Sequence, residues 1–234
     1  MKKYLLLGYI LIGLGIVGLQ LSAKMQTQSQ GQQQTQSEFQ NLKVDTIVHK
    51  GIYDSYFSFK TKTPVFVTYI LFHGGGNCKR NGMVFKGEKG KTFTDAEYKG
   101  SGFDIGHMAD AKDFAFDCDK ELTTFSYYNA IPQTPNCNRG DWKSLEERIR
   151  NYSTNDSILI ICGGYGYKVV GKLNASDYCF KIFKNLRTKV ITAHVFTNIN
   201  NSTDDVVDYN VLITSLPFDI SVKDKIKELL NPKK

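Results

Sequence analysis

Gly106-His107 is the dipeptide in this chain with the clearest capacity for acid–base chemistry. The ordinary pKa of an imidazole lies close to neutrality, so a histidine can accept a proton at working pH. Small and polar residues interrupt the surrounding run 102–111, which favours a loop over an ordinary buried strand or helix. Such a pair also occurs in loops without chemistry, so a catalytic role depends on the residues that follow.

Two further groups lie downstream, Asn129-Ala130-Ile131-Pro132-Gln133 and Asn138-Arg139-Gly140-Asp141-Trp142. The second leads into a run with helical spacing, and we expect a helix over residues 142–152. Trp142, Glu146 and Arg150 then recur every four residues along one stripe, with Asn138 at the start of the helix.

This helix could serve either chemistry or structure. Leu145 and Ile149 fall on an adjacent stripe and can anchor it to a sheet, which leaves the face with Asn138 and Glu146 free for chemistry. In the structural alternative, Asn138 is only an N-cap and Glu146–Arg150 is an ordinary ion pair one turn apart. The presence of His107 and the Asn-x-x-Pro-Gln group favours a role in chemistry over the structural alternative.

Together the three groups resemble the signature of the DNA/RNA non-specific endonuclease family of the ββα-metal superfamily, which includes endonuclease G and bacterial sugar-non-specific nucleases. That signature reads Asp-Arg-Gly-His, Asn-x-x-Pro-Gln and Asn-x-x-x-Trp-x-x-x-Glu. The first motif is present as Asp104-Ile105-Gly106-His107, with isoleucine in place of the arginine, and the other two match in residue type and spacing. The resemblance extends from about His49 to about Phe196.

The resemblance implies a metal-dependent endonuclease that hydrolyses phosphodiester bonds of DNA and RNA to 5′-phosphate products, with little sequence preference. His107 would be the general base, Asn129 would orient the imidazole or its surroundings, Asn138 would bind the metal directly, and Glu146 would hold metal-bound water. Mg²⁺ suits a site with one direct ligand because it keeps most of its waters, and Mn²⁺ or another divalent cation is the alternative.

Several cations are candidates for contacts to the substrate phosphates: Arg80, Arg139, Arg150 and Lys99. In the family, an arginine in the loop that matches Arg80 contacts the phosphate, so Arg80 is also a catalytic candidate, with a solvated surface charge as the alternative. Ile105 removes one cationic contact of the family. We therefore expect Arg80, Arg139 or Lys99 to compensate, or else slower turnover or an atypical substrate.

The resemblance implies an α+β fold with a mixed or antiparallel central sheet flanked by helices and containing a ββα-metal motif. Alternation and apolar runs predict strands at 53–59 and 64–72, and further strands at 157–162 and 188–197 in a second sheet segment. We also expect Gly163-Gly164-Tyr165-Gly166 to form a turn. Ser221-x-x-Asp224 resembles a capping box that opens a C-terminal helix.

The chain is basic, with 30 Lys+Arg against 23 Asp+Glu, which favours a polyanion or an anionic membrane surface as partner. Residues 1–23 carry a positive head and an uncharged run at 4–22, typical of a signal peptide or of an uncleaved anchor in the membrane. Residues 24–40 form a Gln/Ser/Thr-rich tract that we expect to be a disordered linker. The nuclease domain would span 41–234 and be exported: secreted, periplasmic or membrane-anchored outside the cytoplasm.

Cysteine and histidine positions add further expectations. Cys162 and Cys179 lie in apolar runs and are predicted to be buried, whereas three cysteines in loop-like sequence could pair after export: Cys78, Cys118 and Cys137. The remaining histidines lack partner spacing and are predicted to be structural or solvent-exposed: His49, His73 and His194. The competing functional interpretation is a membrane-tethered nucleic-acid-binding module with weakened or lost catalysis.

Overall fold

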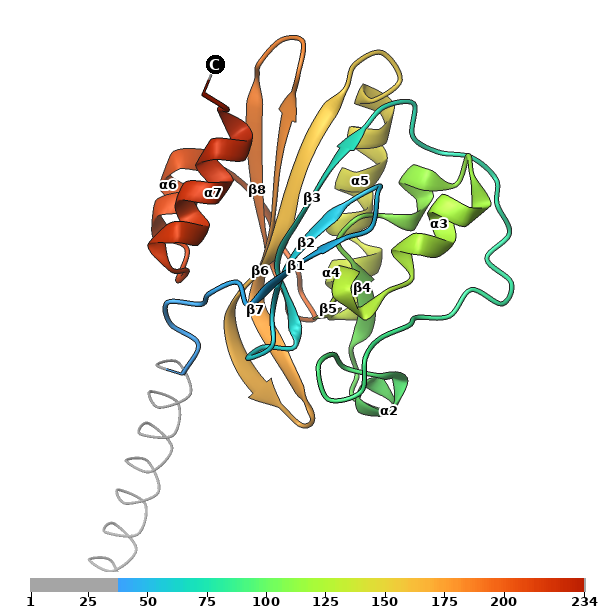
Figure 1. Ribbon diagram of the computed structural model, residues 1–234, viewed down its shortest axis with the longest axis vertical. Coiled ribbons are helices and arrows are strands. Elements are labelled where there is room, and N and C mark those ends of the chain that lie inside the picture. The colour runs from blue at the N-terminus through green and yellow to red at the C-terminus, as the bar shows by residue number, and fades with distance from the viewer. Residues whose placement is uncertain (1–37, 234) are drawn as a thin grey trace, which may run out of the picture. The chain divides into compact units, whose positions relative to one another are not determined.

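The computed structural model describes residues 38–233, so the predicted signal or anchor and most of the predicted linker lie outside it. Its largest element is an antiparallel seven-stranded sheet with strand order β1-β2-β3-β6-β7-β8-β9 (Figure 1). The strands are β1 (Thr46–His49), β2 (Asp54–Ser58), β3 (Thr63–Leu71), β6 (Ile158–Val170), β7 (Leu173–Asn185), β8 (Ile191–Thr197) and β9 (Asp204–Val207).

A second, two-stranded sheet pairs β4 (Asp104–His107) with β5 (Ala130–Gln133), and His107 lies opposite Ala130. Two helices follow β5 directly, α4 (Pro135–Arg139) and α5 (Asp141–Tyr152). Strand, strand and helix thus form a ββα unit, which confirms the predicted α+β class and the predicted helix. The expectation of a loop around His107 was wrong, because His107 ends a short strand.

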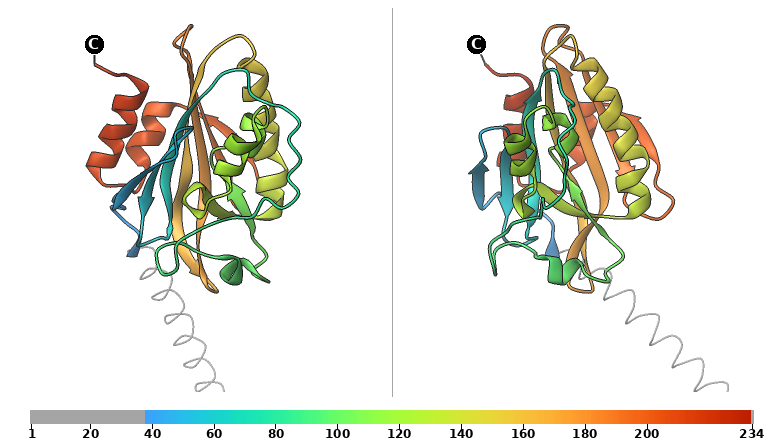
Figure 2. Two further views of the ribbon diagram at one scale, coloured as in Figure 1. Left: turned by 45° about the vertical axis from the view of Figure 1, so that its right-hand side comes forward. Right: turned by 90° about the vertical axis from the view of Figure 1, so that its right-hand side faces the viewer.

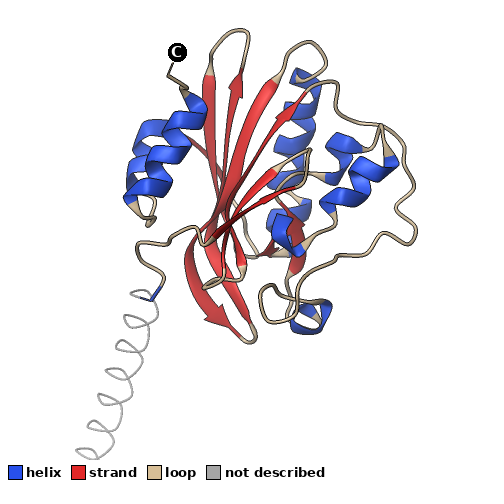
Figure 3. Ribbon diagram, in the orientation of Figure 1, coloured by secondary structure: helices blue, strands red, loops and turns tan. Residues whose placement is uncertain are grey.

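Helices cover both faces of the large sheet (Figures 2 and 3). The C-terminal helices α6 (Tyr209–Ser215) and α7 (Ile220–Leu230) pack on one face, and α5 lies on the other. Alternation along β6 explains how one strand serves both cores, since side chains point to opposite faces in turn. Leu159 and Ile161 pack with the C-terminal helices, whereas Ile158 and Ile160 pack with α5.

The connection between β3 and α4 carries the remaining short elements: α2 (Asp95–Tyr98), η1 (Ala111–Phe114), α3 (Cys118–Thr124) and η2 (Tyr127–Asn129). A disulfide between Cys78 and Cys118 ties the long loop after β3 to the start of α3. Cys137, Cys162 and Cys179 are buried free thiols. The folded unit begins at Phe39, which is buried in the core beside the C-terminal helices.

Three local expectations were wrong. Residues 163–166 lie within β6 and not in a turn. The glycine at 163 reflects the close approach of β3, since a Cβ on Gly163 would lie 2.3 Å from the Val65 carbonyl oxygen. The strands predicted at 157–162 and 188–197 belong to the one seven-stranded sheet, not to a second segment. Helix α7 is capped by Asp219, whose Oδ1 atom accepts hydrogen bonds from the amide (3.0 Å) and the hydroxyl (2.6 Å) of Ser221, so Ser221 lies inside the helix.

No helix within residues 38–233 is both long enough and apolar enough to cross a membrane. The predicted segment 4–22 lies outside these residues.

Candidate active site

One cavity of about 680 Å³ brings together most of the predicted site residues. Its lining includes residues from the first and third motifs, from α5 and from the loop after β3, namely His107, Asn138, Glu146, Arg80, Arg139 and Arg150. Lys99 does not line it and lies exposed at the end of α2. The cavity also contains side chains that the sequence did not single out: Asp110, Lys112, Glu121, Lys143 and Glu147.

The glycine before His107 is required by the second motif. β4 and β5 pair so that Gly106 lies opposite Ile131, and the side chain of Gln133 lies against Gly106. A Cβ on Gly106 would lie 1.9 Å from the Gln133 Oε1 atom, so a side chain cannot be accommodated there. The Gly-His and Pro-Gln dipeptides are therefore packed against each other. This packing fixes the position of His107 at the end of β4.

Aromatic rings enclose the imidazole of His107. The Phe85 and Phe125 rings lie 4.7 Å and 4.8 Å from it, centroid to centroid. Its Nε2 atom is buried and has no hydrogen-bond partner within residues 38–233. Burial lowers the pKa of His107 to about 4, partly opposed by Asp110 and assisted by Arg80. The imidazole is thus neutral at neutral pH, with an unpartnered nitrogen that can take a proton.

Asn129 acts on the backbone beside His107, not on the imidazole. Its Oδ1 atom accepts a hydrogen bond from the Ala109 amide (2.8 Å), and its Nδ2 atom donates to the carbonyls of Ala109 (2.9 Å) and Thr124 (3.0 Å). The side chain is fully buried and does not line the cavity. Asn129 is therefore a positioning residue that holds the chain two residues beyond His107.

Asn138 lies in α4, where Asp104 orients its amide. Its Nδ2 atom donates to Asp104 Oδ2 (2.9 Å), which leaves the amide oxygen as the group available to a cation. Arg139 donates to both oxygens of the same carboxylate, at 2.8 Å and 2.6 Å. The N-cap alternative for Asn138 was wrong, because Thr134 caps α4 and Gly140 stands at the start of α5.

Glu146 is buried beside a lysine that the sequence analysis missed. Lys181, on β7, donates from Nζ to Glu146 Oε1 (3.0 Å), and its ammonium lies 4.1 Å from the centre of the Trp142 ring. Burial raises the pKa of Glu146 to about 8, opposed by the charge of Lys181. A lysine inside the apolar run 178–183 was the available signal, since a buried lysine requires a partner.

The Glu146–Arg150 ion pair of the structural alternative is not formed. Arg150 donates from Nε to Asp113 Oδ1 (2.9 Å) and also contacts the carboxylate of Asp110. Asp113 is almost fully buried, and burial raises its pKa to about 7, with Asp110 adding to the shift and Arg150 opposing it. Arg150 therefore bridges η1 and α5 at the wall of the cavity.

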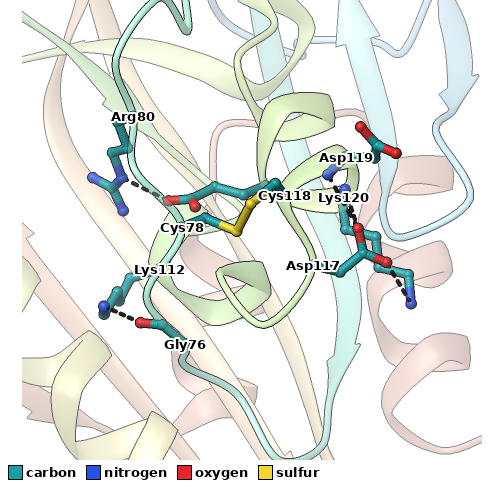
Figure 4. The surroundings of a disulfide bond; sticks show 9 residues. Gly76, Cys78, Arg80, Lys112, Asp117, Cys118, Asp119 and Lys120 are labelled. Atoms are coloured by element: carbon teal, nitrogen blue, oxygen red, sulfur yellow. Dashed lines mark hydrogen bonds and ion pairs between the residues drawn. A yellow bond between two sulfur atoms is a disulfide. The ribbon is translucent and has the colours of Figure 1, made fainter.

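The disulfide holds Arg80 near the cavity. Cys78 lines the cavity, and Arg80, two residues further on, donates from Nε to the buried Glu121 of α3 (2.6 Å). Figure 4 shows the disulfide beside this ion pair, with Arg80 and Lys112 on one side of the sulfur bridge. The other oxygen of Glu121, Oε2, is buried without a partner among the described residues.

The donor set suits a hard cation that needs few protein ligands. Within residues 38–233, no three His, Cys, Asp or Glu side chains are grouped to hold a metal ion. The Asn138 amide oxygen and the Glu146 carboxylate line the same cavity, and both are oxygen donors. Mg²⁺ binds through one or two protein oxygens and keeps its remaining waters, so these residues fit it.

Comparisons with known proteins bear on the family and the fold of this chain. A family model described as DNA/RNA non-specific endonuclease matches residues 29–218. A nuclease from Nostoc sp. is 33% identical over 93 residues, which cover 38% of this chain and 34% of that protein. Human mitochondrial endonuclease G is 35% identical over 71 residues, which cover 30% of this chain and 24% of the relative. The chain thus aligns with between about a quarter and about a third of the length of these relatives.

A solved structure of an EndoG/EndoGI complex superposes with a TM-score of 0.63. The match covers 78% of this chain and 87% of that chain at 20% identity, which shows a shared fold.

Proposed function

This chain belongs to the DNA/RNA non-specific endonuclease family, as its motifs predicted, and on that premise we propose that it is a metal-dependent endonuclease. It would hydrolyse DNA and RNA without sequence preference, leaving 5′-phosphate and 3′-hydroxyl ends. The observation that carries the proposal is a neutral histidine with a buried, unpartnered nitrogen, in the same cavity as Asn138 and Glu146.

His107 would take a proton from the water that attacks phosphorus. The lowered pKa keeps the imidazole neutral, and the hydrogen-bonded Ala109 backbone keeps it in place through Asn129. Asn138 and Glu146 would hold a divalent cation, which when bound supplies neutralisation of the charge on the phosphate and on the departing oxygen. Asp104 and Lys181 would hold these two side chains in position.

Contacts to the phosphate backbone, and not to base edges, would explain a lack of sequence preference. Arg80, Arg139 and Arg150 line the cavity, as such contacts require. Each is bound to a carboxylate, so each would share its charge between protein and substrate. This neutralisation, with Ile105 in place of an arginine, favours modest turnover and supports the binding module as the alternative.

Digestion of plasmid DNA and of RNA by the purified full-length chain tests the proposal. We expect both to be cut in Mg²⁺, with EDTA abolishing cleavage and Asn138→Ala reducing it at least tenfold. The new ends should accept label from polynucleotide kinase only after phosphatase treatment, as 5′-phosphates do. Binding of both nucleic acids without cleavage in any divalent metal would instead establish the alternative module.

We also propose that the domain works outside the cytoplasm, because the disulfide between Cys78 and Cys118 is a feature of oxidising compartments. Alkylation and mass spectrometry of the native protein test this. The bridge should be intact, and the mature N-terminus would distinguish a cleaved signal peptide from a retained anchor. A reduced pair in native material would contradict the proposal.

A further inference from the structure

We propose that Lys112 contacts a substrate phosphate and offsets the arginine that this chain lacks at position 105. The inference rests on the proposed function and assigns a further substrate-binding residue to the same site. It arises from the charges that line the cavity, and it concerns a lysine outside the three sequence motifs.

Ile105 cannot supply the missing contact. Its side chain packs against a separate apolar cluster that contains Phe93, Tyr98 and Tyr127, with Phe85 and Phe103 beside it. It does not line the cavity. Position 105 is therefore committed to packing, and any replacement for a cationic contact must come from another element.

Most cations of the cavity are already neutralised. Arg80 is bound to Glu121 (2.6 Å), Arg139 to Asp104 (2.6 Å), and Arg150 to Asp113 (2.9 Å). Lys143 lies 3.8 Å from Glu147 in a pair that is largely exposed, so its charge is only weakly compensated. Lys112 is the one cavity cation for which the described part of the chain provides no carboxylate within ion-pair distance.

The backbone around Lys112 is fixed. Lys112 lies in η1, and its amide donates to the Oδ1 atom of the N-cap Asp110 (3.1 Å). Its ammonium donates to the carbonyl of Gly76. Gly76 is itself pressed against the backbone of Ala115, since a Cβ there would lie 2.1 Å from the Ala115 carbonyl carbon. The lysine is thus anchored at both ends.

This arrangement leaves capacity for a ligand. An ammonium has three donors, and the carbonyl of Gly76 uses one of them, so two remain for phosphate oxygens. Lys112 and Arg80 extend to the same side of the Cys78–Cys118 disulfide (Figure 4). A phosphate in the cavity would therefore meet one uncompensated cation, Lys112, beside the paired guanidinium of Arg80.

Three charge-removing variants of the full-length chain test the proposal: Lys112→Met, Lys143→Met and Lys172→Met. Lys172 lies in the exposed turn between β6 and β7 and controls for the loss of one net charge. Two quantities are measured with a short DNA duplex: kcat/KM in Mg²⁺, and the dependence of binding on salt concentration in EDTA. Lys112→Arg and Lys112→Gln accompany them, so that the result does not depend on one variant.

We expect Lys112→Met and Lys112→Gln to lower kcat/KM by roughly ten- to a hundredfold, and Lys112→Arg to restore most of it. The slope of log K against log salt should fall by about 0.9 in Lys112→Met, as for one lost phosphate contact. Lys172→Met should match the wild type in both measurements, and Lys143→Met should lie between them.

A Lys112→Met variant that matches Lys172→Met in both measurements overturns the proposal, while cleavage by the wild type leaves the proposed function intact. A loss confined to Lys143→Met overturns it equally and assigns the contact to α5. If the wild type binds DNA but never cleaves it, the proposed function fails, and the salt slope alone decides the role of Lys112.

Discussion

His107 and His194 lie on opposite flanks of helix α5. They differ in the hydrogen bonding of a ring nitrogen. Lys143, Glu146, Glu147 and Arg150 of this helix face the cavity of His107. Leu145, Arg148 and Tyr152 face a second pocket, of about 550 Å³, which His194 lines. Aromatic rings flank both imidazoles: Phe85 and Phe125 around His107, and Phe183 and Phe196 around His194.

Hydrogen bonding separates the two histidines. His194 Nδ1 is bound to Asp204 Oδ1 (2.7 Å), and Asp204 Oδ2 in turn lies 3.3 Å from Arg148. His107 Nε2 is buried without any partner in the described chain. Because buried polar atoms are nearly always paired, an unpaired one is an unusual cost that a ligand can relieve. A pocket's volume therefore says less about function than the unsatisfied atoms it contains.

Removing each imidazole in turn is the strongest test of this comparison. We expect His107→Ala to lower kcat for plasmid cleavage by about 10²–10⁴-fold, the usual contribution of a general base. His194→Ala should retain cleavage within about threefold but lose roughly 1–3 kcal/mol of unfolding free energy, because Asp204 loses a buried partner. Equal losses of activity in the two variants, measured well below their melting temperatures, would remove the distinction.

Arg150 provides the next largest expected effect, on stability. Arg150→Met leaves Asp113 and Asp110 without their cation, and breaking a buried pair typically costs about 3–5 kcal/mol. The loss should be measured by urea unfolding at pH 8, where Asp113, with a pKa of about 7, is ionised. Arg150→Lys is the control and should recover part of the loss. A loss under 1 kcal/mol would show that the buried carboxylates do not depend on Arg150.

The pKa of His107 makes its burial visible in the pH dependence of stability. Between pH 6.5 and 4 the unfolded chain binds a proton at His107 that the folded chain does not, so the unfolding free energy falls as pH drops through this window. A shift from 6.5 to about 4 corresponds to roughly 3 kcal/mol, and no further loss from this group occurs below pH 4.

Glu146 and Asp113 have raised pKa values and contribute with the opposite sign, so the test is a difference between two proteins. The stability of the wild type relative to His107→Ala should decline by roughly 3 kcal/mol from pH 7 to pH 4. Urea unfolding at several pH values measures both curves. Parallel curves would show that His107 titrates normally and that its ring is not desolvated.

Local spacing predicted the elements of the site better than the partners of its side chains. Four-residue spacing was sufficient for α5 and for the burial of Leu145 and Ile149. The same spacing suggested a Glu146–Arg150 pair, yet the actual partners come from β7 and η1. Pairing across elements depends on the tertiary fold, which the spacing within one helix does not encode.

The glycines at 163–166 and two of the lysines show the same limit of prediction from local sequence. The glycines at 163–166 suggested a turn, but they lie within β6, where Val65 of β3 lies close to Gly163 and Ser176 of β7 lies close to Gly164. Lys99 was a candidate phosphate contact, whereas the structure brings Lys112 into the cavity instead. The placement of η1 against the loop after β3, which depends on the tertiary fold, brings Lys112 to the cavity.

Arg148 should show the smallest effect and gives the comparison its control. It lies two residues before Arg150 on the opposite flank of α5, is about half exposed, and forms an ion pair with Asp204 at 3.3 Å. Exposed ion pairs contribute little, so Arg148→Ala should lower the unfolding free energy by less than about 1 kcal/mol and leave cleavage unchanged. Asp204 keeps its bond to His194 in this variant. A cleavage defect without a stability defect would instead show that the nucleic acid reaches the pocket of His194. The hydrogen-bonded His194 would then no longer indicate that its side of α5 is purely structural.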